Sequence, residues 1–135
     1  MSGEKARAER LQRLVEVQGR KRQMEEWRLA ELKREETALA ASSVEILQSL
    51  GDQSLLHGLF LEAKAATLKR NEVRIATNRS AQEVASVKLR DSQSIEKRIG
   101  RASDDARVLA DRVAEQQALD LALDDYLTST AASFE

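Results

Sequence analysis

Apolar residues in the C-terminal third of the chain recur at alternating steps of four and three. The stripe consists of Ile95, Ile99, Ala102, Ala106, Leu109, Val113, Gln116, Leu123 and Leu127, with a polar step at Asp120. Such steps average about 3.5 residues, the period that keeps one side of an α-helix facing a partner helix along its length. The segment is therefore predicted to be one helix of a coiled coil, which requires a second helix.

The N-terminal part of the chain carries a second apolar seam. Its main row consists of Leu32, Leu39 and Ile46, each one heptad from the next. Leu29 and Leu50 belong to the companion row, but Glu36 and Ser43 interrupt that row. This pattern predicts a helix that can pair with the C-terminal one.

One break separates the two seams, at residues 49–54. Gly51 can take the left-handed conformation that ends a helix, and Asp52 or Ser54 can cap the next helix. We expect helices over residues 4–49 and 55–129, about 70 and 110 Å long at about 1.5 Å per residue. The predicted fold class is all-α: one domain of residues 1–135 that forms an elongated antiparallel two-helix coiled-coil hairpin with a longer C-terminal helix.

Two features of the second helix leave its course open. The apolar positions before residue 95 do not continue in phase with the C-terminal stripe, which predicts a stutter or a local straightening around residues 85–95. Gly100 precedes the possible helix cap Ser103-Asp104-Asp105. A third helix over residues 103–129, folded back as a three-helix bundle, is therefore the competing topology.

Composition favours paired helices over a thick globular core. Charged residues make up 33% of the chain and aromatic residues 3%, and there is no proline to stop a helix. The absence of cysteine excludes disulfides and cysteine-containing zinc sites, and it is typical of a reducing cytoplasm. No apolar run is long enough for a membrane span or a secretory signal, so we expect a soluble protein.

The charges are distributed unevenly along the chain. Residues 1–22 hold seven basic and three acidic side chains, a balance of +4, whereas residues 101–135 hold three basic and eight acidic ones, a balance of −5. In an antiparallel hairpin these ends lie close together, so their pairing would help to set the orientation of the helices. Solvated helix faces are the alternative interpretation.

Sequence motifs for catalysis or cofactor binding are absent. His57 is the single histidine and has no evident nucleophile or orienting partner. Neither glycine-rich phosphate loops nor calcium-loop spacings occur, so we expect no enzyme, no metal and no cofactor. Arg20-Lys21-Arg22 lies in a basic helical stretch, so nucleic-acid binding is one possible function. The interleaved Glu9 and Glu16 and the slightly acidic chain argue against it.

Both ends of the hairpin resemble the FliJ family of flagellar type III export proteins, which is related to the SctO (YscO-like) stalk proteins. The N-terminal resemblance rests on residues 10–17, Arg-Leu-Gln-Arg-Leu-Val-Glu-Val, and on Leu29-Ala30-Glu31-Leu32. The C-terminal resemblance rests on residues 95–98, Ile-Glu-Lys-Arg, and on residues 114–120, Ala-Glu-Gln-Gln-Ala-Leu-Asp, with Asp124. The chain departs from the family at residues 121–125, Leu-Ala-Leu-Asp-Asp, where the family usually continues Glu-Leu/Phe-Ala after Leu-Asp.

The resemblance implies a cytoplasmic stalk, peripheral to the membrane, that enters the ring of the flagellar export ATPase without hydrolysing ATP itself. It also implies contacts with the export gate FlhA and with export chaperones. A structural or adaptor coiled coil without an ATPase partner is the alternative. Because the second helix outruns the first by about thirty residues, a single-helix tip on the order of 45 Å is expected, which would enter a pore or pair with another copy as a homodimer.

Candidate functional residues follow from this interpretation. Those expected to bind a partner are Asp111, Glu115, Gln116, Leu119, Asp120, Leu123, Asp124 and Leu127, with Leu11 and Leu14 at the other end of the chain. Those expected to form the coiled-coil core are Leu32, Leu39, Ile46, Ile95, Ile99, Leu109 and Val113.

Overall fold

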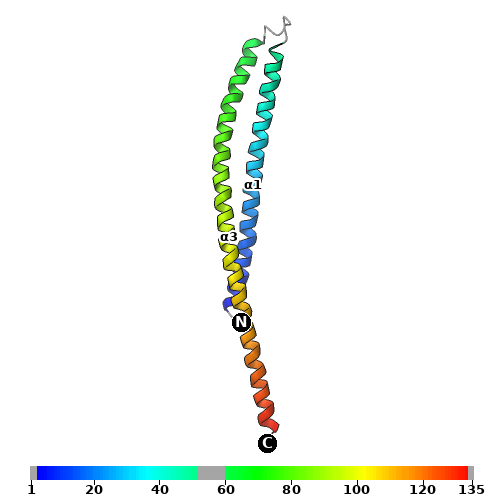
Figure 1. Cartoon of the computed structure of the whole chain (residues 1–135), viewed down its shortest axis with the longest axis vertical. Helices are drawn as coiled ribbons and strands as arrows, with labels where there is room; N and C mark the ends of the chain where they lie inside the picture. Colours follow the sequence, from blue (N-terminus) through cyan, green and yellow to red (C-terminus); the bar gives the residue numbers. More distant parts are fainter. Residues whose placement is uncertain (1–2, 52–59, 134–135) are drawn as a thin grey trace. The chain divides into compact units, whose positions relative to one another are not determined.

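The computed structural model describes residues 3–51 and 60–133, and almost all of them are helical. Helix α1 spans Gly3–Ser49 and helix α3 spans Leu61–Ser133. The two helices pack against each other as an all-α hairpin (Figure 1). The predicted fold class, a two-helix hairpin with a longer C-terminal helix, is confirmed.

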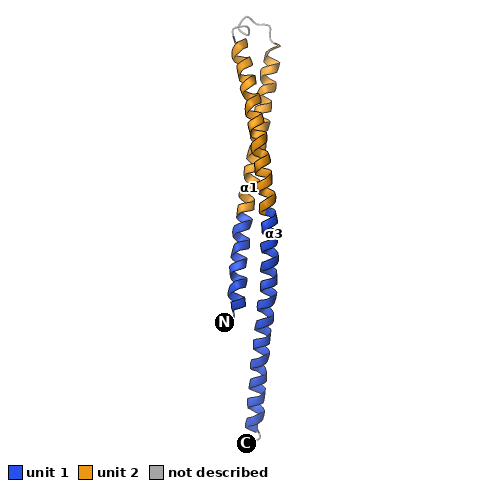
Figure 2. Ribbon diagram, turned by 90° about the vertical axis from the view of Figure 1, so that its left-hand side faces the viewer, with its two compact units in different colours: residues 1–20, 93–135 blue, residues 21–92 orange. Residues whose placement is uncertain are grey.

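The hairpin divides into two units, each built from a piece of α1 and a piece of α3 (Figure 2). The unit that we call the terminal unit consists of residues 1–20 and 93–135. The unit that we call the central unit consists of residues 21–92. In the central unit, Asn71 of α3 contacts Ser43 of α1 and Asn78 contacts Leu32. As the residue number increases along α3, the number of the contacted residue on α1 decreases, so the helices are antiparallel.

The first helix ends differently from the sequence expectation. The amide of Gly51 donates to the carbonyl of Gln48 at 3.2 Å, a bond three residues back that tightens the last turn. Gly51 does not adopt the left-handed conformation, so that prediction was wrong. The carbonyl of Ile46 accepts twice at this helix end, from the amide of Leu50 at 3.1 Å and from the hydroxyl of Ser49 at 2.7 Å. The predicted caps Asp52 and Ser54, the predicted helix start near Leu55, and His57 lie outside the described residues.

Buried and half-buried residues recur at steps of four and three along both helices. On α1 they are Glu4, Ala8, Leu11, Val15, Gln18, Arg22, Glu25, Leu29, Leu32, Glu36, Leu39, Ser43 and Ile46. On α3 they are Lys64, Leu68, Asn71, Ile75, Asn78, Gln82, Ala85, Leu89, Ser92, Glu96, Ile99, Ser103, Ala106, Ala110 and Val113. We call these positions the seam. The series on α3 has no interruption, so the predicted stutter at residues 85–95 is absent.

Five of the residues expected in the coiled-coil core lie in the seam, and two lie beside it. Leu32 is buried, and Leu39, Ile46, Ile99 and Val113 are half-buried. By contrast, Ile95 is 37% exposed and Leu109 is 45% exposed. Each of these two precedes a seam residue by one position, so both lie beside the seam. Leu68, Ile75 and Leu89 are spaced by multiples of seven, and the same spacing continues through Glu96, Ser103 and Ala110. These three therefore face α1, although the row one position earlier is more apolar.

The three-helix alternative is also wrong. Helix α3 passes through Gly100 without a break. Ser103, the proposed cap of a third helix, is buried in the seam, where its hydroxyl lies 3.4 Å from the side-chain oxygen of Gln12 on α1. Because Ser103 faces α1 from within a continuous helix, it caps nothing.

Candidate functional site

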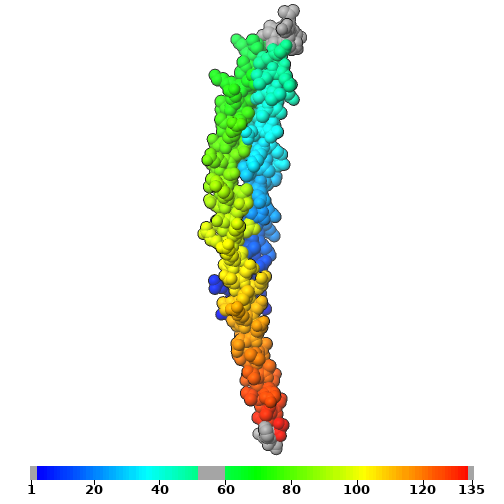
Figure 3. Space-filling view, viewed as in Figure 1, coloured from blue at the N-terminus to red at the C-terminus, as the bar shows by residue number. Residues whose placement is uncertain are grey.

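Among the described residues of the terminal unit, no helix packs against the last part of α3. Every residue from 114 to 129 is exposed, and α1 begins only at Gly3, level with the part of α3 that precedes this segment (Figures 2 and 3). We call residues 114–133 the C-terminal segment. Its twenty residues span about 30 Å. The uncovered tip is therefore shorter than the sequence suggested, because the seam continues to Val113.

Large apolar side chains are exposed on this segment. Leu119, Leu123, Tyr126 and Leu127 are each between 50% and 67% exposed. Their spacing of i, i+4, i+7 and i+8 places them on one side of the helix. A second apolar position, Leu121, is 65% exposed and lies on the opposite side. An apolar stripe of this kind is characteristic of a helix that packs against a partner.

The C-terminal segment is acidic. It contains Glu115, Asp120, Asp124 and Asp125 and no lysine or arginine. The amide of Gln116 donates to the carboxylate of Asp120 at 3.2 Å, one turn along the helix. The segment combines an apolar stripe with a net negative charge, so a matching partner surface is apolar and basic.

The structure brings most of the sequence-predicted partner residues together. Glu115, Gln116, Leu119, Asp120, Leu123, Asp124 and Leu127 all lie in the C-terminal segment and are exposed. Asp111 is exposed just before it. Leu11 is half-buried in the seam and packs within the hairpin, whereas Leu14 is 50% exposed. Their binding roles remain predictions.

A further apolar surface, which the sequence did not single out, lies beside the seam in the terminal unit. It is formed by Leu14 and Val17 of α1 and by Ile95, Ala102 and Leu109 of α3. We call these five residues the flank. Leu14, Ile95, Ala102 and Leu109 each immediately precede a seam residue, which puts them on one side of their helix. The sequence signal for the flank was the apolar row at 95, 102 and 109, which we assigned to the seam.

The central unit contains a polar network in its seam. The side-chain nitrogen of Asn78 donates to the backbone carbonyl of Leu32 at 3.0 Å. The side-chain oxygen of Asn78 accepts a hydrogen bond from the amide of Gln82 at 2.6 Å. Gln82 also donates to Glu36 at 2.5 Å, and the Nε of Arg79 donates to the other oxygen of Glu36 at 2.8 Å. These bonds, first that from Arg79, lower the pKa of Glu36 below its ordinary value.

Two asparagines lie buried in the seam of the central unit. Asn71 and Asn78 are each 4% exposed and lie one heptad apart. The amide of Asn71 lies 3.2 Å from the Ser43 hydroxyl. A buried polar group pairs in only one register, and seam asparagines specify register in coiled coils. The signal was present in the sequence as asparagine at heptad spacing.

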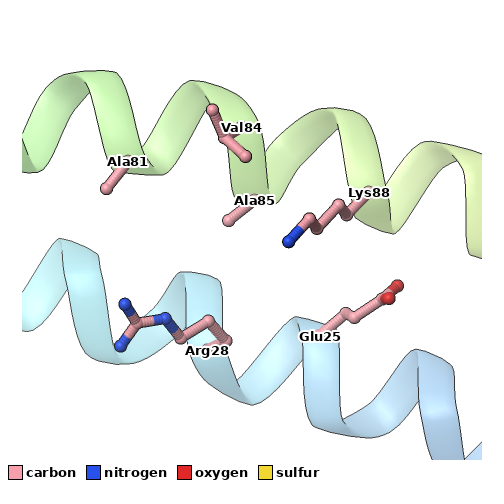
Figure 4. A pocket seen from close by; sticks show the side chains of 6 residues that line it. All are labelled: Glu25, Arg28, Ala81, Val84, Ala85 and Lys88. Atoms are coloured by element: carbon pink, nitrogen blue, oxygen red, sulfur yellow. The ribbon is translucent and has the colours of Figure 1, made fainter.

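A small groove of about 240 Å³ lies in the central unit, between α1 and α3 (Figure 4). Glu25 and Arg28 extend into it from α1, and Ala81, Ala85 and Lys88 project from α3. One carboxylate oxygen of Glu25 is buried without a hydrogen-bond partner. The groove shows that residues preceding the seam on α1 (Arg28) and on α3 (Ala81, Lys88) lie on the same side of the hairpin.

No group of three or more histidine, aspartate or glutamate side chains in residues 3–51 and 60–133 is arranged to hold a metal ion. Neither of the two described helices contains a stretch both long and apolar enough to cross a lipid bilayer. The exposed C-terminal segment and the flank form the candidate site. Comparison of the chain with protein-family models, curated proteins and solved structures found no match.

Proposed function

We propose that this chain is a non-catalytic coiled-coil stalk of the flagellar type III export apparatus, which binds the export ATPase ring through the C-terminal segment. In this proposal it acts in the cytoplasm at the membrane-bound apparatus. It also links the ring to the export gate FlhA and to export chaperones. The chain contributes no group to ATP hydrolysis.

The uncovered C-terminal segment is the observation that carries this proposal. A single helix about 10–12 Å across with its side chains fits where two packed helices would not, such as the opening of a ring. The segment ends the longer helix and joins directly to a paired hairpin that holds its base. The resemblance of residues 10–17 and 114–120 to the FliJ family supports the same function.

A rod without catalytic groups can still accelerate the ATPase. A ligand that binds the assembled ring more tightly than free subunits shifts the assembly equilibrium by that difference in affinity. The acidic, apolar surface of the C-terminal segment would meet basic and apolar residues inside the ring. Stimulation is therefore expected to be greatest at low ATPase concentration, where the ring is least assembled.

Truncation after Val113 tests this proposal. The shortened chain keeps the seam, so its helicity and melting temperature should stay close to those of the full chain, while its stimulation of the purified export ATPase should be lost. Lys97→Glu, an exposed change elsewhere on α3, is the control and should stimulate like the full chain. Equal stimulation by the truncated and full chains would exclude a role for the segment. No stimulation by the full chain would favour the adaptor without an ATPase partner.

A further inference from the structure

We propose that the C-terminal segment of one copy of this chain docks on the flank of a second copy, and that the contact is reciprocal. The product is a closed, two-fold symmetric dimer. In it, each terminal unit gains a third helix from its partner. This inference does not depend on the export ATPase.

The flank is positioned to receive a helix. In the terminal unit, Gly19 lies beside Glu96, with 3.7 Å between the Glu96 carboxylate and the position of a Cβ on Gly19, and Gln12 contacts Ser103. These pairs set Leu14 level with the α3 residues between Glu96 and Ser103. Gln12 and Gly19 each follow a seam residue, whereas Leu14 precedes one, so Leu14 lies on the opposite side of α1. In an antiparallel pair this is the side that carries Ile95, Ala102 and Leu109.

Charge complements the apolar match. Five charged residues that border the flank are exposed: the arginines Arg7, Arg10, Arg98 and Arg112 and one carboxylate, Asp105, which leaves a net positive charge. The C-terminal segment brings four carboxylates and no basic residue. Docking would bury Leu119, Leu123 and Tyr126 against Leu14, Ile95 and Leu109, and would bring the carboxylates toward the arginines. Both exposed apolar surfaces of the terminal unit are then covered by one contact.

The occupant must be another copy rather than the same chain. Helix α3 is continuous to Ser133, and neither glycine nor proline occurs after Gly100, so the segment cannot fold back on its own flank without breaking the helix. Pairing of two C-terminal segments with each other is disfavoured, because both are acidic. The flank of a second copy offers the opposite charge, and a reciprocal contact closes after two copies.

Sedimentation equilibrium of the purified full chain over a range of concentrations tests this inference. We expect a monomer–dimer equilibrium that weakens as salt is added. Leu123→Asp places a carboxylate in the contact and should raise the dimer dissociation constant about a hundredfold or more. Leu121→Asp is the matched control: it makes the same change on the opposite side of the segment, and its constant should stay within about twofold of the native value.

A charge reversal separates docking on the flank from pairing of the segments. Arg10→Glu should weaken the dimer about tenfold, whereas Lys97→Glu, the same charge change away from the flank, should not. A chain that stays monomeric at all concentrations would overturn the inference. So would equal effects of Leu121→Asp and Leu123→Asp, growth into open polymers, or a dimer that is sensitive to Leu123→Asp but not to Arg10→Glu. Circular dichroism of each variant checks that the hairpin remains helical.

Discussion

At the scale of single residues, the seam combines a few leucines with many small and polar side chains. Leu32, Ala85 and Ala106 are the buried apolar residues among those described, and the buried polar ones are Asn71, Asn78, Ser92 and Ser103. Apolar burial drives helix pairing, whereas the asparagines restrict it to one register. The stability of the hairpin should therefore depend strongly on the few buried apolar positions.

Leu32→Ala and Leu109→Ala should differ in their effects on stability. Leu32 is 5% exposed, so its truncation should lower the free energy of unfolding by about 2 kcal/mol or more. Leu109 lies beside the seam, and its truncation should cost less than about 1 kcal/mol in dilute solution. Denaturant titration of both variants at low protein concentration measures the difference. If Leu109→Ala lowered the free energy of unfolding more than Leu32→Ala does, Leu109 would belong to the packed core.

Acid should weaken the hairpin through Glu36. Its hydrogen bonds from Arg79 and Gln82 lower the folded pKa below the ordinary value of 4.5. The stabilisation is therefore complete above about pH 4.5 and is lost as the pH falls through the folded pKa. The difference in free energy of unfolding between the native chain and Glu36→Gln should be constant at neutral pH and shrink in acid. A difference that does not change with pH would contradict this role.

The residues that sequence reasoning placed wrongly share one physical cause. A single apolar row stands out on α1, and its members Leu32, Leu39 and Ile46 all lie in the seam. On α3, two neighbouring rows compete: Ile95, Ala102 and Leu109 against Glu96, Ser103 and Ala110. Choosing the more apolar row required the stutter that the structure lacks. Which row faces α1 depends on the heptad phase of the whole helix, and the residues around 95–110 alone do not show that phase.

At the scale of helices, the absence of proline and the single break near residue 50 were enough to predict both elements. The observed bounds of α1, Gly3–Ser49, differ from the expected 4–49 by one residue, and α3 ends at Ser133 rather than near 129. The alternative break at Gly100 could not be rejected from the sequence, because a glycine followed by Ser-Asp-Asp is a genuine cap signal. Packing of Ser103 against α1 overrides that signal.

Gly100→Ala should stabilise α3. A Cβ at Gly100 would meet no atom within 4 Å, and the residue lies inside a continuous helix. Alanine restricts the unfolded chain and favours the helix, so the free energy of unfolding should rise by about 0.5–1 kcal/mol. Thermal melting followed by circular dichroism measures the change. A lower melting temperature would mean that the backbone at Gly100 is not helical in solution.

At the scale of the whole molecule, the two ends of the chain carry the surfaces that we propose bind partners. The terminal unit contains both the acidic C-terminal segment and the flank bordered by arginines, whereas the central unit contains the asparagine and Glu36 network that holds the register. The sequence predicted an uncovered C-terminal tip, because an apolar stripe continues past the end of the partner helix. It missed the flank, since only the packed structure shows which apolar row the seam leaves uncovered.

Amide hydrogen exchange tests whether residues 114–133 are uncovered within the chain and bind a partner. In dilute protein, this segment should exchange faster than residues 93–113, because no second helix protects it. Addition of the export ATPase should slow exchange in residues 114–133 and leave the central unit unchanged. Slow exchange of the segment in the dilute chain, or no change in it when the ATPase is bound, would contradict the account.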